Sequence, residues 1–135
     1  MERTTLISPH GNDTLIISIL DGKALDDARR RAAKLPKAAI TSREAADLIM
    51  IGIGAFTPLG GFMGHDDWDR VCREMRMTGG TFWPIPITLS HDRRLSPGEE
   101  IALIFDETGE MMAVIKVTES YTIDREFECR NVFGT

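Results

Sequence analysis

The chain has 135 residues, of which 42% are hydrophobic and 27% charged, and its formal net charge is −5. This size and composition predict one globular domain, residues 1–135, with a hydrophobic core. The acidic balance disfavours a dedicated nucleic-acid-binding protein, and no apolar run reaches the ~20 residues of a membrane-spanning helix. The two widely spaced cysteines, Cys72 and Cys129, predict reduced thiols in a cytoplasmic protein.

The first predicted elements are a strand and a helix. The β-branched run of residues 14–20 predicts the strand. A helix is expected to follow Asp21-Gly22 and to end at Pro36, which cannot continue it. Its apolar face has helical spacing and comprises Leu25, Ala28, Ala32 and Leu35.

Two further helices have recognisable start signals. Thr41 and Glu44 have the spacing of a capping box, which predicts a helix that begins after Thr41. Asp66 is the predicted N-cap of the next helix, which Gly79-Gly80 is expected to stop. The apolar stripes of the two helices are Ala45, Leu48, Ile49 and Gly52 in the first, and Trp68, Val71, Cys72 and Met75 in the second.

The second half of the chain has the pattern of strands. Strands are predicted over residues 85–90, 100–105 and 111–118, with a hairpin connection at residues 106–110. Asp124 is the predicted cap of a short helix that runs to about Val132, with Gly134 just beyond it. Because helices cluster in residues 1–80 and strands follow them, the sequence predicts an α+β fold rather than alternating βαβ units.

Two apolar segments, residues 54–63 and 82–89, fit neither a regular helix nor a regular strand. Three prolines remove backbone donors, and Gly60-Gly61 permits backbone angles that other residues avoid. The backbone groups of such segments need partners outside a simple ladder, which predicts a specific tertiary role. We expect their aromatic residues to anchor the core rather than to stack on a nucleic-acid base: Phe56, Phe62, Phe82 and Trp83.

No motif in the chain predicts catalysis or metal binding. Gly52-x-Gly54 has Thr57 where a dinucleotide fingerprint needs its third glycine, and it ends a helix instead of opening one, so we expect helix termination and tight packing. The histidines, His10, His65 and His91, lack partners at metal-ligand spacing. Two acidic clusters lie at predicted helix starts, where carboxylates interact favourably with the helix dipole: Asp66-Asp67-Asp69 and Asp21-Asp26-Asp27. The basic run Arg29–Arg31 is expected to lie on a solvated helix face.

An ordered set of segments resembles the amino-terminal domain of ATP sulfurylase (sulfate adenylyltransferase). Residues 54–63, GAFTPLGGFM, and residues 82–89, FWPIPITL, are the longest of these segments. The others occur in the same order as in the family and extend the resemblance over almost the whole chain: Pro9-His-Gly11, Ser42-Arg-Glu-x-x-Asp-Leu48, Met75-Arg-Met77, Gly98-x-x-Ile-Ala-Leu103 and Val132-Phe-Gly-Thr135.

The resemblance implies a PUA-like fold, a small β-barrel with helices packed around it. It also implies a parent enzyme that transfers the adenylyl group of ATP to sulfate, with magnesium, giving adenosine 5′-phosphosulfate and pyrophosphate. In the family the catalytic motifs, Gln-x-Arg-Asn, His-x-x-His and Gly-Arg-Asp, lie in the next domain. Residues 128–131, ECRN, imitate the first motif but have glutamate in place of glutamine and precede Val132 instead of proline.

The expected function is therefore that of a non-catalytic domain that folds independently and buttresses the catalytic domain. No catalytic, cofactor-binding or metal-binding residue is assigned to this chain, and ATP and magnesium are implied only for the full enzyme. The expected partners are the catalytic domain of the same enzyme and further copies in a homo-oligomer, with no nucleic acid and no membrane. Two alternatives are a stand-alone PUA-like module that binds RNA or a small ligand, and a pure dimerisation domain.

Overall fold

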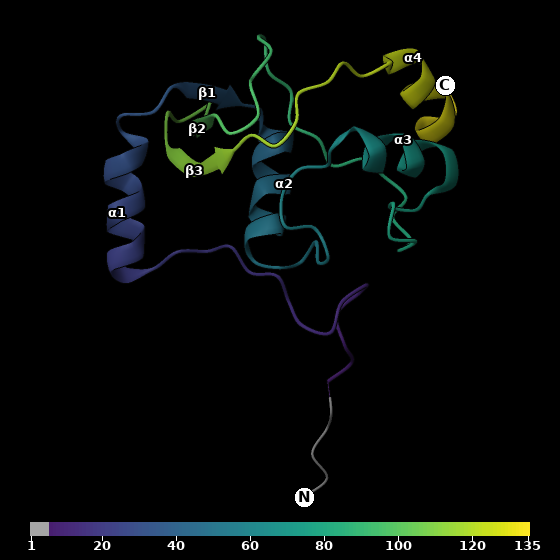
Figure 1. The fold of residues 1–135 in the computed structure, drawn as a ribbon, viewed down its shortest axis with the longest axis horizontal. Helices are drawn as coiled ribbons and strands as arrows, with labels where there is room; N and C mark the ends of the chain where they lie inside the picture. The colour runs from purple at the N-terminus through teal and green to yellow at the C-terminus, as the bar shows by residue number, and fades with distance from the viewer. Residues whose placement is uncertain (1–5) are drawn as a thin grey trace, which may run out of the picture.

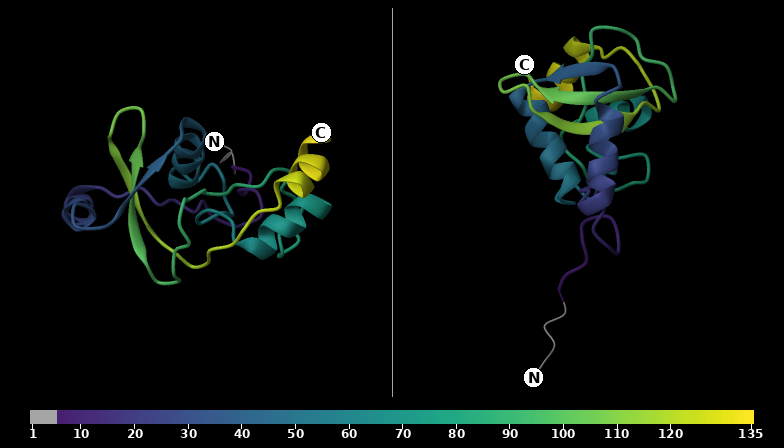
Figure 2. Two further views of the ribbon diagram at one scale, coloured as in Figure 1. Left: turned by 90° about the horizontal axis from the view of Figure 1, so that it is seen from above. Right: turned by 90° about the vertical axis from the view of Figure 1, so that its left-hand side faces the viewer.

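The computed structural model describes residues 6–135 as an α+β domain with a three-stranded sheet. Helix α1 lies on one face of the sheet and α2 on the other, while α3 and the C-terminal helical turns lie side by side at the far end (Figures 1 and 2). In chain order the elements are α1 (Gly22–Ala32), β1 (Lys37–Ile40), α2 (Ser42–Gly52), α3 (His65–Glu74), β2 (Glu100–Phe105), β3 (Met111–Lys116), α4 (Arg125–Glu128) and the π-helix η1 (Cys129–Phe133).

The strand order in the sheet is β1-β2-β3, with β2 in the centre. The pair β2–β3 is the predicted antiparallel hairpin, and β1 lies parallel to β2. Because both faces of β2 are covered, its sequence EIALIF is a continuous apolar run rather than an alternating one. The three strands form an open sheet, so the α+β class is confirmed and the closed barrel stays a prediction.

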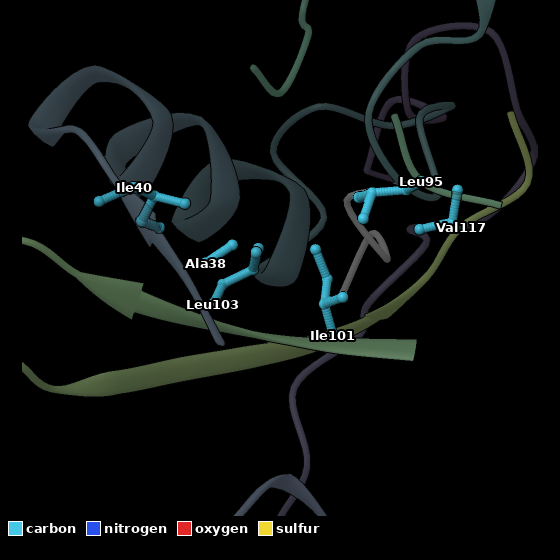
Figure 3. Packing of buried hydrophobic residues seen from close by; sticks show 7 residues of the cluster. Ala38, Ile40, Leu95, Ile101, Leu103 and Val117 are labelled. Carbon is cyan, nitrogen blue, oxygen red and sulfur yellow. The ribbon is translucent and has the colours of Figure 1, made fainter. Parts of the chain in front are cut away.

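The main core lies between the sheet and α2. Ile40, Ile101 and Leu103 are almost completely buried there, and Leu95 and Val117 meet at one end of the cluster (Figure 3). In β1 the burial alternates, with Ala38 and Ile40 inside, as the period of a strand dictates. Burial of each large aliphatic side chain contributes about 1.5–3 kcal/mol.

The predicted capping box at the start of α2 is confirmed. The Thr41 hydroxyl accepts a hydrogen bond from the Glu44 amide at 3.3 Å, and the Glu44 carboxylate accepts from the Thr41 amide at 3.2 Å. The predicted cap of the last helix is confirmed as well, since the Asp124 carboxylate accepts from the Phe127 amide at 3.0 Å. Gly134 follows η1 in the left-handed conformation that favours glycine.

Two predicted strands are wrong, and one strand was missed. Residues 15–20 and 86–90 run outside any helix or sheet ladder. Pro84 and Pro86 lack the amide donors that a ladder needs, and Ser18 donates to the carbonyl of Gly52, at the end of α2, instead of to a strand. The missed strand β1 has only four residues, and its parallel pairing with β2 joins positions far apart in the sequence.

Two helix boundaries also differ from the prediction. Helix α1 ends at Ala32, before Pro36. Helix α3 begins at His65 with Gly64 as its N-cap, so Asp66 lies in its first turn instead of capping it, and the helix ends at Glu74, before Gly79-Gly80. A distant carboxylate replaces the predicted cap, because Glu119 accepts the hydrogen bond of the His65 amide at 3.1 Å.

Within residues 6–135, every helix is too short or too polar to cross a lipid bilayer.

Candidate functional site

A groove of about 1110 Å³ opens in the described part of the chain. Three stretches form most of its walls: residues 83–91, residues 115–123, and the C-terminal helical turns with Arg125, Cys129 and Phe133. They can be followed in Figure 1 as the green connection after α3, the yellow-green connection after β3, and the yellow turns at the C-terminus. We call this feature the central groove.

Apolar side chains dominate the central groove. Pro86 and Ile87 are buried in its wall, whereas Ile85 keeps 50% and Phe133 59% of its surface exposed. Phe62 and Ile115 are partly buried and link the groove to the sheet core. The groove is therefore an apolar surface that the described residues leave partly uncovered.

The backbone of residues 118–123 has free hydrogen-bonding groups along the groove. Within the described residues, none of these six amides donates a hydrogen bond. The neighbouring Val117 amide still donates to the carbonyl of Glu99 at 2.8 Å, so pairing with the β2 side of the sheet stops there. These amides are therefore left to solvent within the described residues.

The buried carboxylate of Glu44 fastens one wall of the groove to α2. Besides its capping bond, it accepts from the Thr41 hydroxyl at 2.8 Å and from the Ser90 amide at 3.0 Å. Asp47, one turn further along α2, lines the groove. Burial raises the pKa of Asp47, the nearby Arg43 guanidinium opposes that shift, and the Glu44 charge adds to it.

An aromatic cluster fastens the other wall to α3. The Tyr121 hydroxyl donates to the carbonyl of Met63 at 2.7 Å, and the Trp68 indole donates to the Glu128 carboxylate at 2.5 Å. The His65 ring meets the Tyr121 ring edge to face at 5.4 Å between centroids. Burial first, and the charges of neighbouring carboxylates second, raise the pKa of Tyr121 well above its ordinary value, so its hydroxyl stays a donor.

Cys72 is buried behind this cluster, on α3. Burial, followed by the Glu128 and Asp69 charges, raises the pKa of its thiol to about 11. A thiol with so high a pKa is a poor nucleophile at neutral pH. Cys129 is exposed, and both cysteines are free thiols.

The N-terminal segment packs against the irregular segment of residues 54–63. The Ile16 amide donates to the Thr57 hydroxyl at 3.0 Å, and that hydroxyl donates to the Gly54 carbonyl at 2.6 Å. Gly54 has φ of +80°, and a Cβ added there would come within 3.2 Å of the Ile16 carbonyl. The interpretation of Gly52-x-Gly54 as a packing feature is therefore confirmed.

Three of the four predicted aromatic anchors are confirmed. Phe56, Phe62 and Trp83 pack against the buried clusters, and the rings of Phe56 and Trp83 meet edge to face at 5.5 Å. The prediction is wrong for Phe82, which is half exposed. Its backbone carbonyl, rather than its ring, makes a tertiary contact, at 2.7 Å from a ring nitrogen of His10.

The remaining polar residues singled out in the sequence form local contacts, such as Arg30 with Asp27, and do not converge on one site. Asp67 accepts from the amide and hydroxyl of Thr78, which ties the loop after α3 back to that helix. In the ECRN stretch, Glu128 accepts from Trp68, and Arg130 forms an exposed ion pair with Glu126. Among residues 6–135, no three His, Cys, Asp or Glu side chains are grouped so that they could hold a metal ion.

No pattern in the sequence predicted the central groove. The amides along the groove are free because no distant segment of the described chain pairs with them. A local sequence pattern does not predict such a long-range absence. The one available signal is the polar run of residues 118–122, TESYT, in which the chain's only tyrosine lies directly after the last strand. A lone aromatic residue in a polar connection indicates a tertiary contact.

A family profile described as the PUA-like domain matches residues 7–135. The chain belongs to the PUA-like domain family. Its sequence is also 52% identical, over 131 residues, to a sulfate adenylyltransferase of Thiobacillus denitrificans, a match that covers 96% of this chain and 33% of that relative. A sulfate adenylyltransferase of Chlorobium chlorochromatii is 48% identical over 136 residues, covering 97% of this chain and 34% of the relative.

Among solved structures, the hexameric APS kinase from Thiobacillus denitrificans has a similar fold. Its TM-score is 0.75 at 34% sequence identity, and the match covers 88% of this chain and 24% of that one. The chain thus spans about a third of the curated relatives it matches. The resemblance to a domain of sulfate adenylyltransferase is confirmed.

Proposed function

We propose that residues 1–135 are the non-catalytic PUA-like domain of a sulfate adenylyltransferase. The full enzyme would transfer the adenylyl group of ATP to sulfate and release pyrophosphate. The observation that carries this proposal is the match itself: about half of the residues are identical over almost the whole chain, yet only about a third of each relative is covered. The domain's role would be to buttress the catalytic domain.

The bonding around the central groove supports a structural role. Glu44, Trp68 and Tyr121 each use their polar atoms to hold one wall of the groove to a helix or loop of the same domain. Adenylyl transfer instead needs cationic groups that converge on the phosphates. Here Arg93 is paired with Glu99, and Arg43 lies 3.5 Å from Asp47.

The same groups do not fit ATP with magnesium. Apolar side chains dominate the groove, and two of the three arginines that border it, Arg43 and Arg93, are paired with carboxylates. We therefore place nucleotide and metal outside residues 1–135 and assign no catalytic step to these residues.

The test is an assay of purified residues 1–135 in the direction of ATP formation. The chain is supplied with adenosine phosphosulfate, pyrophosphate and magnesium, and ATP is detected by luciferase. We expect no turnover above the blank, while the full-length Thiobacillus denitrificans relative under the same conditions serves as the positive control. Robust turnover by the isolated chain would refute the non-catalytic assignment.

A second candidate is a PUA-like module that binds RNA or a small ligand, and the volume of the central groove favours the small ligand. The net charge of −5 and the paired arginines disfavour RNA. A titration of labelled RNA at increasing salt decides this point, because phosphate contacts make affinity fall steeply with salt. Salt-sensitive binding would favour the module, and the absence of binding at low salt would remove the RNA candidate.

Three finer features belong to the same proposal: a closed barrel, a homo-oligomer and a cytoplasmic location. The APS kinase of similar fold is described as hexameric, which supports assembly of the parent enzyme. The two free thiols support a reducing compartment. Sedimentation of the chain at several concentrations tests whether this domain alone associates.

A further inference from the structure

Residues 14–20, TLIISIL, have the sequence of a strand but join no sheet ladder within the described chain. The segment passes the C-terminal end of α2 on its way to α1, along the outside of the domain (Figure 1). The amides of Ile16 and Ser18 donate into the domain, to the Thr57 hydroxyl and the Gly52 carbonyl. Every second residue of the segment is therefore fastened to the body of the domain.

The residues between them have backbone groups that face away from the domain. Successive residues of an extended chain direct their N–H and C=O groups to opposite sides, so those of Leu15, Ile17 and Ile19 point outwards. Within residues 6–135, none of these three amides donates a hydrogen bond and none of these three carbonyls accepts one. The segment is thus an unpaired strand edge, the usual template for pairing with another strand.

Exposed apolar side chains surround this free edge. A Cβ added at Gly52 would come within 3.7 Å of Ile19, and one added at Gly54 within 3.2 Å of Ile17, so the segment lies against the last turn of α2. Ile49 and Ile53 flank Gly52 on the same side of that helix. We call the resulting surface the N-terminal face; its half-exposed members are Leu15, Ile17, Ile19, Leu20, Ile49 and Ile53. It presents roughly 600 Å² of apolar surface, which is large for a protein that stays monomeric.

We propose that two copies of this chain pair through the N-terminal face, with residues 14–20 of each forming an antiparallel ladder about a two-fold axis. Ile17 would lie opposite Ile17 of the second copy, and Leu15 opposite Ile19. In this register the outward groups of both copies satisfy one another in about six hydrogen bonds. The contact closes after two copies because both use the same surface. The inference rests on the proposed function, since it names the surface through which the homo-oligomer assembles.

The size of the face and its lack of charge favour a second copy as the occupant. Residues 14–20 contain no charged side chain, so a nucleic acid or a charged peptide would find no complementary group there. A standard dimer buries about 800 Å² per partner, slightly more than the roughly 600 Å² of apolar surface that the N-terminal face provides. We therefore expect a reversible dimer with a Kd on the order of 10 μM.

The flanking charges give this dimer a characteristic salt dependence. Asp13 and Asp21 follow the two ends of the segment, and the proposed register sets Asp13 of one copy opposite Asp21 of the other. Like charges in opposite positions weaken a strand pair, and salt screens them. The dimer should therefore tighten as salt is raised, and Asp13→Asn should tighten it at low salt. A contact based on opposite charges would weaken with salt, which would overturn the proposal.

Sedimentation of residues 1–135 between about 1 and about 200 μM tests the association, with one matched pair of substitutions. Ile19→Lys places a charge on the N-terminal face, at a side chain that is 63% exposed, and Ile85→Lys places the same charge in the central groove, at one that is 50% exposed. We expect Ile19→Lys to raise the Kd at least about tenfold and Ile85→Lys to leave it unchanged. A chain that stays monomeric throughout, or equal effects of the two substitutions, would overturn the proposal.

Disulfide trapping tests the register, in a Cys129→Ser background and a glutathione redox buffer. The two copies of Ile17 lie on the two-fold axis with their Cα atoms about 5.5 Å apart, within the range of a disulfide. The two copies of Leu20 lie about 20 Å apart. Ile17→Cys should therefore form a covalent dimer rapidly and Leu20→Cys should not. Both side chains are exposed, and urea denaturation checks that the variants fold. Equal trapping rates would refute the antiparallel pair.

The remainder of the parent enzyme is the other candidate occupant. Trapping is repeated on residues 1–135 fused ahead of the part of the Thiobacillus denitrificans relative that the match leaves out. We expect the same covalent dimer from Ile17→Cys in the fusion protein. Its loss there would assign the N-terminal face to the rest of the enzyme and overturn the proposal. Trapping reports association and the ATP-formation assay reports catalysis, so their failures are distinguishable.

Discussion

The sheet region and the terminal region of this domain reach stability in different ways. The sheet region, β1–β3 with α1 and α2, buries aliphatic side chains at the regular spacing of strands and helices. The terminal region, α3, α4 and η1 with residues 54–63, 82–91 and 118–123, relies on side chains that bond distant backbone groups, such as Tyr121 to Met63. The first region therefore forms a continuous buried core, whereas the second forms much of the walls of the central groove.

The largest expected loss of unfolding free energy comes from truncating a buried leucine, and one leucine in each region allows the two regions to be compared. Leu103→Ala removes a side chain with no exposed surface from the centre of the sheet, where the neighbours cannot move in, and should lower the free energy of unfolding by about 4 kcal/mol. Leu59 lies in an irregular segment that has more freedom to relax, so Leu59→Ala should lower the free energy of unfolding by about 2–3 kcal/mol. Urea denaturation measures both. Equal losses would show that the two regions are packed equally tightly.

The next effect concerns the carboxylate that joins the groove wall to α2. Glu44→Gln keeps the size of the side chain but replaces charged acceptors with a single amide oxygen, and should cost about 2–3 kcal/mol. The control, Thr41→Ala, removes the N-cap hydroxyl and should cost about 1 kcal/mol. If Thr41→Ala were the more damaging change, capping rather than the bond to Ser90 would be the main role of Glu44.

A smaller effect is expected from the bond that holds residues 118–123 to the loop before α3. Tyr121→Phe removes only the hydroxyl that donates to Met63, and should lower the free energy of unfolding by about 1 kcal/mol. Thr122→Val, at the exposed neighbouring position, should change it by less than about 0.5 kcal/mol. The same urea titrations apply, and a loss at Thr122 as large as that at Tyr121 would contradict this assignment.

The smallest effect at neutral pH involves Cys72. Its pKa is raised from 9.0 to about 11 in the folded chain, so the folded state binds a proton that the unfolded state has already released between those values. This contribution to stability is fully present below pH 9 and is lost as the pH rises towards 11. We expect Cys72→Ala to flatten the fall in unfolding free energy between pH 9 and 11.

Thiol labelling gives a direct check on the same residue. In the native chain at pH 7.5, exposed Cys129 should react with a disulfide reagent at the rate of a free thiol, and buried Cys72 should react only after unfolding. The variant Cys129→Ser should then show no fast phase. Rapid labelling of both cysteines would mean that the terminal region opens readily and is less closed than its aromatic contacts indicate.

The elements that were predicted correctly are those whose signals are local. The capping box at Thr41, the hairpin between β2 and β3, and the cap at Asp124 each depend on residues a few positions apart. The failures share the opposite property. Strand β1 exists only because β2 lies beside it, and helix α3 begins early because Glu119, 54 positions away, accepts its first amide.

The sequence by itself determined the α+β class, most helix starts, and the resemblance to one domain of a sulfate adenylyltransferase. Those properties follow from composition, periodicity and ordered motifs, which are all present along the chain. Only the tertiary structure decided that residues 15–20 and 86–90 stay outside the sheet and that Phe82 is half exposed. It alone showed the central groove, because a segment's free backbone groups depend on which distant segments fold beside it.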